Sequence, residues 1–234
     1  MAIKLYDLAA ANPKIMFGPF SWRSRMALLH KGLDFEVVPW HWNEPNIGPK
    51  NLASVPVLHD GDNWIGDSWD IALYLDKQYP DKPTLMAGAE SQAAAQFVMG
   101  VCGAMVFPGA IPVAVYQAFQ ILDEGSKPLF RKSREEMFGC TLEAIHVGEE
   151  KGKAGLATAL APFNETLASS SFLGGDAPTY ADYVLFGVLK WVDIVSSYRA
   201  IDESSAVGKW FVRLENMYDG YARDVPTVRN TQIA

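Results

Sequence analysis

Apolar and polar positions follow two different rhythms along the chain. In the N-terminal third, short extended runs alternate with helical periods, which predicts a β-α-β unit followed by two strands and a helix. The segment 40–52 between the two parts is polar and irregular, and we expect a loop or a single helical turn there, so that the full order is β-α-β-α-β-β-α. The expected strands are 3–8, 34–38, 54–58 and 64–66, and the expected helices are 20–31 and 68–79.

Beyond residue 90 the strand signals stop and helical periods take over. Pro108, Gly109 and Pro112 should interrupt the first apolar stretch, and Met137, Leu142 and Ile145 should form the inner face of a helix over 133–150. Thr179 and Asp182 have the spacing of a capping box that opens an apolar helix. The expected helices are 92–107, 113–122, 133–150, 154–169, 183–195 and 206–221.

This pattern divides the chain into an α/β domain over residues 1–82, of thioredoxin-like layout, and an all-helical domain over residues 90–234. A redox thioredoxin needs Cys-x-x-Cys at the start of its first helix, but that place reads Gly18-Pro19-Phe20-Ser21, so dithiol chemistry is excluded. The two cysteines, Cys102 and Cys140, are far apart and are expected to be unpaired thiols.

Charge and composition remove several classes of partner. The formal net charge is −7 without a basic run, so nucleic acid and anionic membranes are poor partners. The chain has no window of about 18 uninterrupted apolar residues, so no membrane span is expected. The N-terminus begins with a strand pattern and lacks a signal-peptide core. The four histidines share no metal-ligand spacing, so no metal is expected. A cytoplasmic protein is expected.

Candidate binding chemistry gathers around Val55-Pro56 and Asp67-Ser68. Proline pushes the preceding Val55 toward an extended backbone, which can pair with another peptide as an added strand does. Asp67 and Ser68 stand where a helix begins, so a carboxylate, a hydroxyl and a positive helix end lie together. Such a set suits a small peptide with an α-amino acid head; each pair alone is more typical of a bend or a helix cap, but the two pairs in this order and spacing favour the binding site.

These residues resemble the glutathione-binding half of the glutathione transferases. In that family the residue before a cis proline pairs with the cysteinyl backbone of glutathione, and an acidic residue followed by serine holds the γ-glutamyl head. The resemblance assigns these roles to Val55, Pro56, Asp67 and Ser68. It also implies the family's two-domain fold, glutathione as co-substrate, no metal, and a homodimer.

A closer resemblance is to bacterial β-etherases and their etherase-like fungal relatives, in which glutathione thiolate displaces a phenolate from an aryl ether. The usual serine of that group falls on Gly18, so Ser21 is the candidate side chain to stabilise the thiolate, unless backbone N–H groups around Phe20 do so alone. The stretches that carry this resemblance are Gly18–Arg23, His30–Gly32, Asp67–Trp69, Ser133–Phe138, Phe172–Asp176 and Ala181–Tyr183.

The resulting hypothesis is a glutathione transferase acting on hydrophobic aromatic electrophiles. The alternative is a ligandin, which holds aromatic compounds with little or no turnover; Gly18 favours it. Arg23 is expected to pair with a carboxylate near the first helix. Besides Ser21, the candidate glutathione-binding residues are Phe20, Trp42, Lys50, Ser54, Val55, Pro56, Asp67 and Ser68, and the candidate residues of the hydrophobic substrate site are Phe17, Trp40, Met105 and Tyr116.

Overall fold

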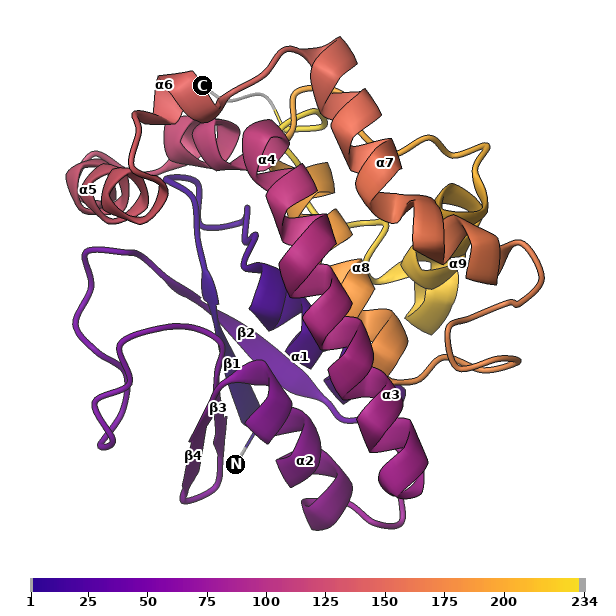
Figure 1. Cartoon of the computed structure of the whole chain (residues 1–234). Helices are drawn as coiled ribbons and strands as arrows, with labels where there is room; N and C mark the ends of the chain where they lie inside the picture. Colours follow the sequence, from indigo (N-terminus) through magenta and orange to yellow (C-terminus); the bar gives the residue numbers. More distant parts are fainter. Residues whose placement is uncertain (1, 232–234) are drawn as a thin grey trace.

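A computed structural model describes residues 2–231 and divides them into an α/β part and a helical part (Figure 1). The sheet has the strand order β2-β1-β3-β4, in which β1 pairs parallel with β2 and antiparallel with β3. Helix α1 makes the crossover between the parallel strands and contacts α2. The elements are β1 (Ile3–Leu8), α1 (Pro19–His30), β2 (Phe35–Trp40), β3 (Val57–Asp60), β4 (Asn63–Gly66) and α2 (Ser68–Gln78). The thioredoxin-like layout is therefore confirmed.

The connection between β2 and β3 contains no helix among the described residues, so the second helix of the order β-α-β-α-β-β-α is absent. Turns replace it, and a single bridge joins Ile47 to Leu52. Gly48 has φ +66 and Asn51 has φ +54, which are left-handed conformations that a right-handed helix excludes. Because this segment is polar and irregular, it forms loops beside the sheet in place of a helix.

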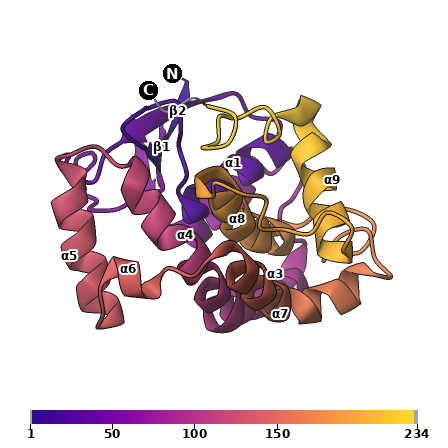
Figure 2. The same cartoon turned by 90° about the horizontal axis from the view of Figure 1, so that it is seen from above.

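The helical part surrounds α8 (Tyr180–Val195), which is buried along its whole length and contacts α1 of the other domain (Figures 1 and 2). Its N-terminus is fixed as the sequence predicts, because the Asp182 carboxylate accepts a hydrogen bond from the Thr179 N–H at 2.9 Å. The other helices are α3 (Gly88–Val101), the π-helix η1 (Cys102–Val106), α4 (Phe107–Ile121), α5 (Ser126–Phe138), α6 (Leu142–Ile145), α7 (Glu149–Leu167) and α9 (Ala206–Gly220).

The expected interruption near Pro108 is wrong, since α3, η1 and α4 form one helical run over Gly88–Ile121. The π-helical turn ends at Val106, two residues before Pro108, and widens the helix where proline lacks an N–H donor and crowds the preceding turn. By length and mean hydropathy this run could also cross a bilayer, a signal that a search for uninterrupted apolar residues missed. Here it packs against α8 and α7.

The helix expected over 133–150 is also wrong. Helix α5 ends at Gly139, whose φ of +69 suits glycine at a helix C-terminus. Thr141 then caps the short helix α6 by accepting the Ala144 N–H. The apolar positions that suggested one face are divided by this break: Leu142 is buried, whereas Met137 is 65% exposed.

Candidate functional site

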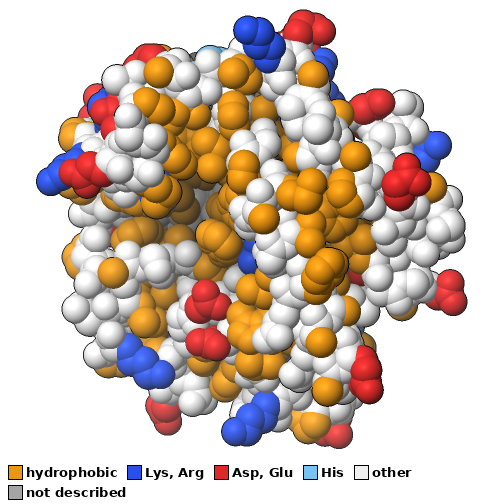
Figure 3. All heavy atoms as spheres, in the orientation of Figure 1, with side chains coloured by type: hydrophobic (Ala, Val, Ile, Leu, Met, Phe, Trp, Pro, Cys, Tyr) orange, Lys and Arg blue, Asp and Glu red, His pale blue; other side chains and the backbone are white. Residues whose placement is uncertain are grey.

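A cleft of about 460 Å³ lies between the sheet's connecting loops and α5 of the helical domain. In Figure 3 the molecule is hollowed in this region, and hydrophobic side chains surround the hollow. The lining residues are Leu8, Gly18, Pro19, Phe20, Trp40, Trp42, Glu44, Asn46, Ala53, Ser54, Val55, Pro56, Asp67 and Arg134. The cleft thus brings together the α1 start, the Val55-Pro56 bend and the α2 start.

Helix α1 presents its N-terminus to this cleft. Pro19 occupies the first turn, where its missing N–H is not needed, and Trp22 N–H is bonded to the Gly18 carbonyl at 3.0 Å. The N–H groups of Phe20 and Ser21 belong to the first turn and have no carbonyl within the helix to accept them. Backbone donors and the positive helix end therefore face the place where an anion can bind.

Ser21 points away from the cleft. Its side chain is fully buried and is not among the lining residues. Its Oγ makes no well-formed hydrogen bond within residues 2–231, although the hydroxyl lies close enough to Asp7 to lower the pKa of that carboxyl. Burial acts more strongly and raises the Asp7 pKa overall, despite the Arg25 guanidinium 2.6 Å away.

The same contacts explain why glycine occupies position 18. A Cβ atom there would lie 2.5 Å from Asp7 Oδ1 and 2.7 Å from Ser21 Oγ. Asp7 cannot retreat easily, because its carboxylate accepts the Gly18 N–H at 3.0 Å and pairs with Arg25. A side chain at this position would enter the protein interior, where it meets buried oxygen atoms.

Gly18→Ser is therefore expected to destabilise the protein without adding a donor to the cleft. Overpacking of this kind lowers the free energy of unfolding by about 1–3 kcal/mol. Urea unfolding measures the change, and Gly155→Ser is the matched control, because a Cβ at Gly155 meets nothing within 4 Å. If Gly18→Ser left the stability unchanged, Asp7 and Ser21 would have to move aside for the new side chain more easily than their contacts indicate.

The Val55-Pro56 bend has the geometry that the resemblance implies. The peptide bond between the two residues is cis. Val55 precedes β3, so its backbone is not part of the sheet ladder, and both residues line the cleft with Ser54. An extended ligand backbone can thus pair with Val55 without displacing a strand.

Asp67 is the acidic residue at the start of α2. Its side chain is exposed, lines the cleft and accepts the Trp69 N–H at 2.7 Å. Its φ of +66 is unusual for a residue with a side chain, and such conformations persist where the surroundings impose them. Ser68 behaves differently: it is 2% exposed, is absent from the cleft wall, and its carbonyl accepts the Tyr180 hydroxyl at 2.6 Å.

The loop after β2 supplies only part of what the sequence suggested. Trp42 lines the cleft, whereas Lys50 lines a neighbouring surface hollow and donates to the Trp64 carbonyl at 2.7 Å. Glu44 and Asn46 also line the cleft and were missed. No motif marked them, because the loop brings them to the cleft through turns that the sequence pattern does not fix.

A second, apolar cavity of about 290 Å³ adjoins the cleft and shares Leu8, Pro19, Phe20 and Arg134 with it. Phe17 lines this cavity, while Trp40 lines the cleft instead. Met105 and Tyr116 line neither. The remaining cavity residues are Phe107, Ile111, Val115, Ala118, Phe130, Met137, Phe138 and Trp191. Most of these come from α4 and α5, whose positions relative to α1 only the tertiary structure reveals.

Arg23 was expected to pair with a carboxylate, but within residues 2–231 it makes no such ion pair. It is 3% exposed, and its guanidinium lies 4.7 Å from the centre of the Phe20 ring. Burial lowers the pKa of Arg23. The carboxylate partner near helix α1 belongs to Arg25, which binds Asp7. Arg23 therefore supports the aromatic wall of the site from beneath.

Residues 17–78 match the glutathione S-transferase N-terminal domain, and residues 93–215 match the glutathione S-transferase C-terminal domain. A glutathione S-transferase of Hyoscyamus muticus is 30% identical over 188 residues, with 78% of each chain covered. The glutathione S-transferase-like protein ustS of Aspergillus flavus is 30% identical over 139 residues, but this match spans only 49% of that protein.

Two fungal structures share the fold across nearly the whole chain. Glutathione transferase GSTFuA3 of Phanerochaete chrysosporium has a TM-score of 0.79 and 25% identity, covering 94% of this chain and 97% of its own. A glutathione S-transferase of Ceriporiopsis subvermispora, solved in complex with glutathione, has a TM-score of 0.79 and 26% identity, covering 97% and 99%. The chain belongs to the glutathione S-transferase family.

Proposed function

We propose that this protein binds glutathione in the cleft and joins it, through its thiolate sulfur, to a hydrophobic aromatic electrophile held in the apolar cavity. The observation that carries the proposal is the convergence of three anchors on one cleft: the α1 N-terminus, the unpaired Val55 backbone and the Asp67 carboxylate. Asp67 suits the α-ammonium of the γ-glutamyl head, and Val55 suits the cysteinyl backbone. The complex of the Ceriporiopsis relative with glutathione supports this choice of ligand.

The reaction needs glutathione as a thiolate. Helix N-termini lower thiol pKa values, and the Phe20 and Ser21 N–H groups are the donors at the α1 start. The thiolate sulfur attacks the electrophilic carbon, a carbon–sulfur bond forms, and the bond to the leaving group breaks with the electron pair leaving on that group. From the resemblance to β-etherases we propose an aryl ether as the electrophile, with phenolate as the leaving group. We also propose that the enzyme is cytoplasmic.

Ultraviolet titration of bound glutathione tests the proposal. We expect thiolate absorbance of the complex to rise with a midpoint clearly below the pKa of a free thiol, about 8.5. Asp67→Asn protein at the same glutathione concentration provides the control, because it should bind less ligand. Absence of saturable glutathione binding would refute the proposal.

An unshifted midpoint with saturable binding would favour the ligandin function instead. One observation supports that second candidate: the Ser21 hydroxyl is buried outside the cleft and Gly18 has no side chain, so the donors that the start of α1 presents to the cleft are backbone N–H groups. Turnover of aryl ethers or chlorodinitrobenzene, measured beside the titration, separates the enzyme from the ligandin.

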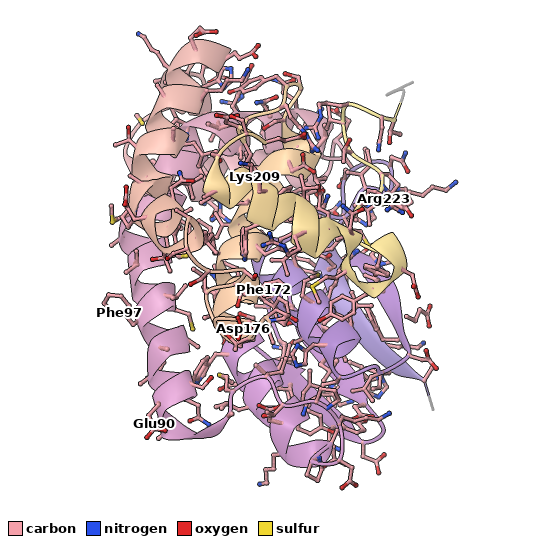
Figure 4. All side chains as sticks on the ribbon, turned by 90° about the vertical axis from the view of Figure 1, so that its right-hand side faces the viewer. Glu90, Phe97, Phe172, Asp176, Lys209 and Arg223 are labelled. Atoms are coloured by element: carbon pink, nitrogen blue, oxygen red, sulfur yellow. The ribbon has the colours of Figure 1, made fainter. Side chains whose placement is uncertain are left out.

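We also propose that a second copy of the chain covers the outer face of α3. Phe97 is 73% exposed and points outward from α3 in Figure 4, and Met105 of η1 is 41% exposed. Residues 91–121 contain no Asp, Glu, Lys or Arg, so this face offers water no charged group. Exposed apolar patches of this kind mark association surfaces.

Phe97→Lys is expected to convert a dimer into a monomer, because a charge would be buried without a partner. Analytical ultracentrifugation measures the mass, and Leu129→Lys is the control, since Leu129 is 48% exposed on α5, away from this face. A wild-type monomer at micromolar concentration would contradict the proposal, as would a Phe97→Lys protein that stays dimeric.

A further inference from the structure

Arg134 stands where the cleft and the apolar cavity meet, and it lines both. Its guanidinium lies 4.8 Å from the centre of the Trp42 ring and 5.2 Å from that of Phe130. Two aromatic faces thus hold this cation in place from different elements, Trp42 from the loop after β2 and Phe130 from α5 itself.

This cation has no anionic partner in the described part of the chain. Among residues 2–231, no carboxylate lies within the 4.0 Å of a salt bridge to Arg134, and its one hydrogen bond is a long contact of 3.4 Å to Ser133 Oγ. Burial lowers the pKa of Arg134, with no neighbouring charge to oppose it. A half-buried guanidinium gives up part of its hydration, and a carboxylate that reaches it supplies charge-assisted hydrogen bonds in return.

Arg131, one turn earlier on α5, provides a comparison, because its guanidinium is paired with carboxylates. Its guanidinium binds Glu143 at 2.7 Å and Glu135 at 2.7 Å, and it also lies over an aromatic ring, that of Phe119 at 4.5 Å. The aromatic contact is common to both arginines. Of the two arginines of α5, Arg134 is thus the one that lacks a carboxylate partner among the described residues, and it is the one that faces the site.

The surroundings indicate on which side an anion would bind. The cleft wall contains Glu44 and Asp67, whose negative charge disfavours a second anion. The apolar cavity contains no acidic side chain among its lining residues, and Arg134 is the only charged one. An aromatic ring can fill the cavity, while an anionic substituent on that ring reaches the guanidinium at the mouth.

We infer that Arg134 selects second substrates or ligands that carry a carboxylate on an aromatic ring. The inference rests on the proposed function, because it names the class of molecule that the apolar cavity takes beside bound glutathione. Arg134 acts as a specificity residue: it holds the substituent, not the reacting atoms.

Calorimetric titration with naphthalene carboxylate and its neutral isostere naphthalene carboxamide tests the inference, with and without saturating glutathione. We expect wild-type protein to bind the carboxylate at least about tenfold more tightly, as a charge-assisted hydrogen bond provides. Arg134→Met, which keeps an apolar stem against Trp42 and Phe130, should abolish this preference and leave carboxamide affinity within about twofold. Arg134→Lys should keep part of the preference, and Arg131→Met should keep all of it.

Three results would overturn the inference: equal affinity of wild-type protein for the two ligands, a preference that survives Arg134→Met, or a preference that Arg131→Met removes equally. Glutathione is titrated into the same variants. If Arg134→Met weakens glutathione binding and leaves the carboxylate preference intact, the guanidinium holds a carboxylate of glutathione, so the inference fails while the proposed function stands. If wild-type protein binds no glutathione, the proposed function fails, and the measurements without glutathione still decide the role of Arg134.

Discussion

Replacing Asp67 by Asn should weaken glutathione binding by roughly tenfold to a hundredfold, because a charged hydrogen bond contributes about 1.5–3 kcal/mol. Asparagine keeps the two local roles of Asp67. It can accept the Trp69 N–H at the start of α2, and it tolerates the positive φ of +66 better than most residues. The substitution therefore removes the charge and leaves the helix start intact.

Asp67→Ala should abolish measurable binding and also destabilise the protein. Alanine removes the ammonium partner together with the cap of α2, and a lost cap costs about 1 kcal/mol. The difference between the two variants thus separates the charge from the fold. Thermal melting of each variant shows whether the helix start has been damaged.

Des-amino glutathione, which lacks the α-ammonium, identifies the group that Asp67 binds. Calorimetry should show weak binding of this analogue to wild-type protein and no further loss on Asp67→Asn, as a double-mutant cycle requires of two groups in contact. Asp70→Asn is the matched control, because Asp70 is an exposed carboxylate in the same first turn and lies outside the cleft wall. If Asp67→Asn and Asp70→Asn lost the same affinity for glutathione, a direct contact between Asp67 and the ammonium would be contradicted. The two carboxylates would then act only through long-range electrostatic attraction.

Features set by a few consecutive residues could be predicted from the sequence. The extended Val55 before Pro56 and the helix start at Asp67 each depend on the conformational limits of adjacent residues. Both features reach the same cleft because a short hairpin, β3 and β4, connects them. The order of elements in the α/β domain followed from the same local signals, apart from the helix expected between β2 and β3.

The orientation of Ser21 could not be predicted, because α1 has no polar face that marks the solvent side. Residues 21–28 are all buried, including Ser21, Arg23 and Arg25. Such a helix is enclosed by the sheet on one side and α8 on the other, and the partners alone decide which side chain faces the cleft. For such a helix, the spacing of apolar residues does not predict which way a side chain in the first turn, such as Ser21, will point.

Arg134 was missed for a related reason. Its position in the site depends on the helix break at Gly139 and on how α5 approaches the loop that carries Trp42. These segments are separated by about two fifths of the chain, and nothing in either one specifies their contact. Apolar spacing across Gly139 instead suggested one long helix, which would have carried Met137 into the core and not to the apolar cavity.

The largest loss of stability is expected from Asp182→Ala, at the start of α8. The carboxylate is fully buried and accepts hydrogen bonds from the Leu173 N–H at 2.7 Å, the Thr179 N–H at 2.9 Å and the Trp210 indole N–H at 2.8 Å. Its removal leaves these donors buried without an acceptor, and each such donor costs about 1–3 kcal/mol. The total loss should exceed about 3 kcal/mol.

Thermal melting should show the loss as a fall of about 10 °C, the scale expected for a chain of this size. Asp182→Asn should fall less, because its amide oxygen can still accept the Leu173 and Trp210 N–H groups, which share one carboxylate oxygen, while its NH₂ group faces the Thr179 N–H. Asp176→Ala is the control: it removes an exposed aspartate from the same loop, labelled in Figure 4, and should change the melting temperature little. If Asp182→Ala and Asp176→Ala had the same melting temperature, the N–H groups of the loop before α8 would have to find other acceptors. The Asp182 carboxylate would then not be needed for the stability of the fold.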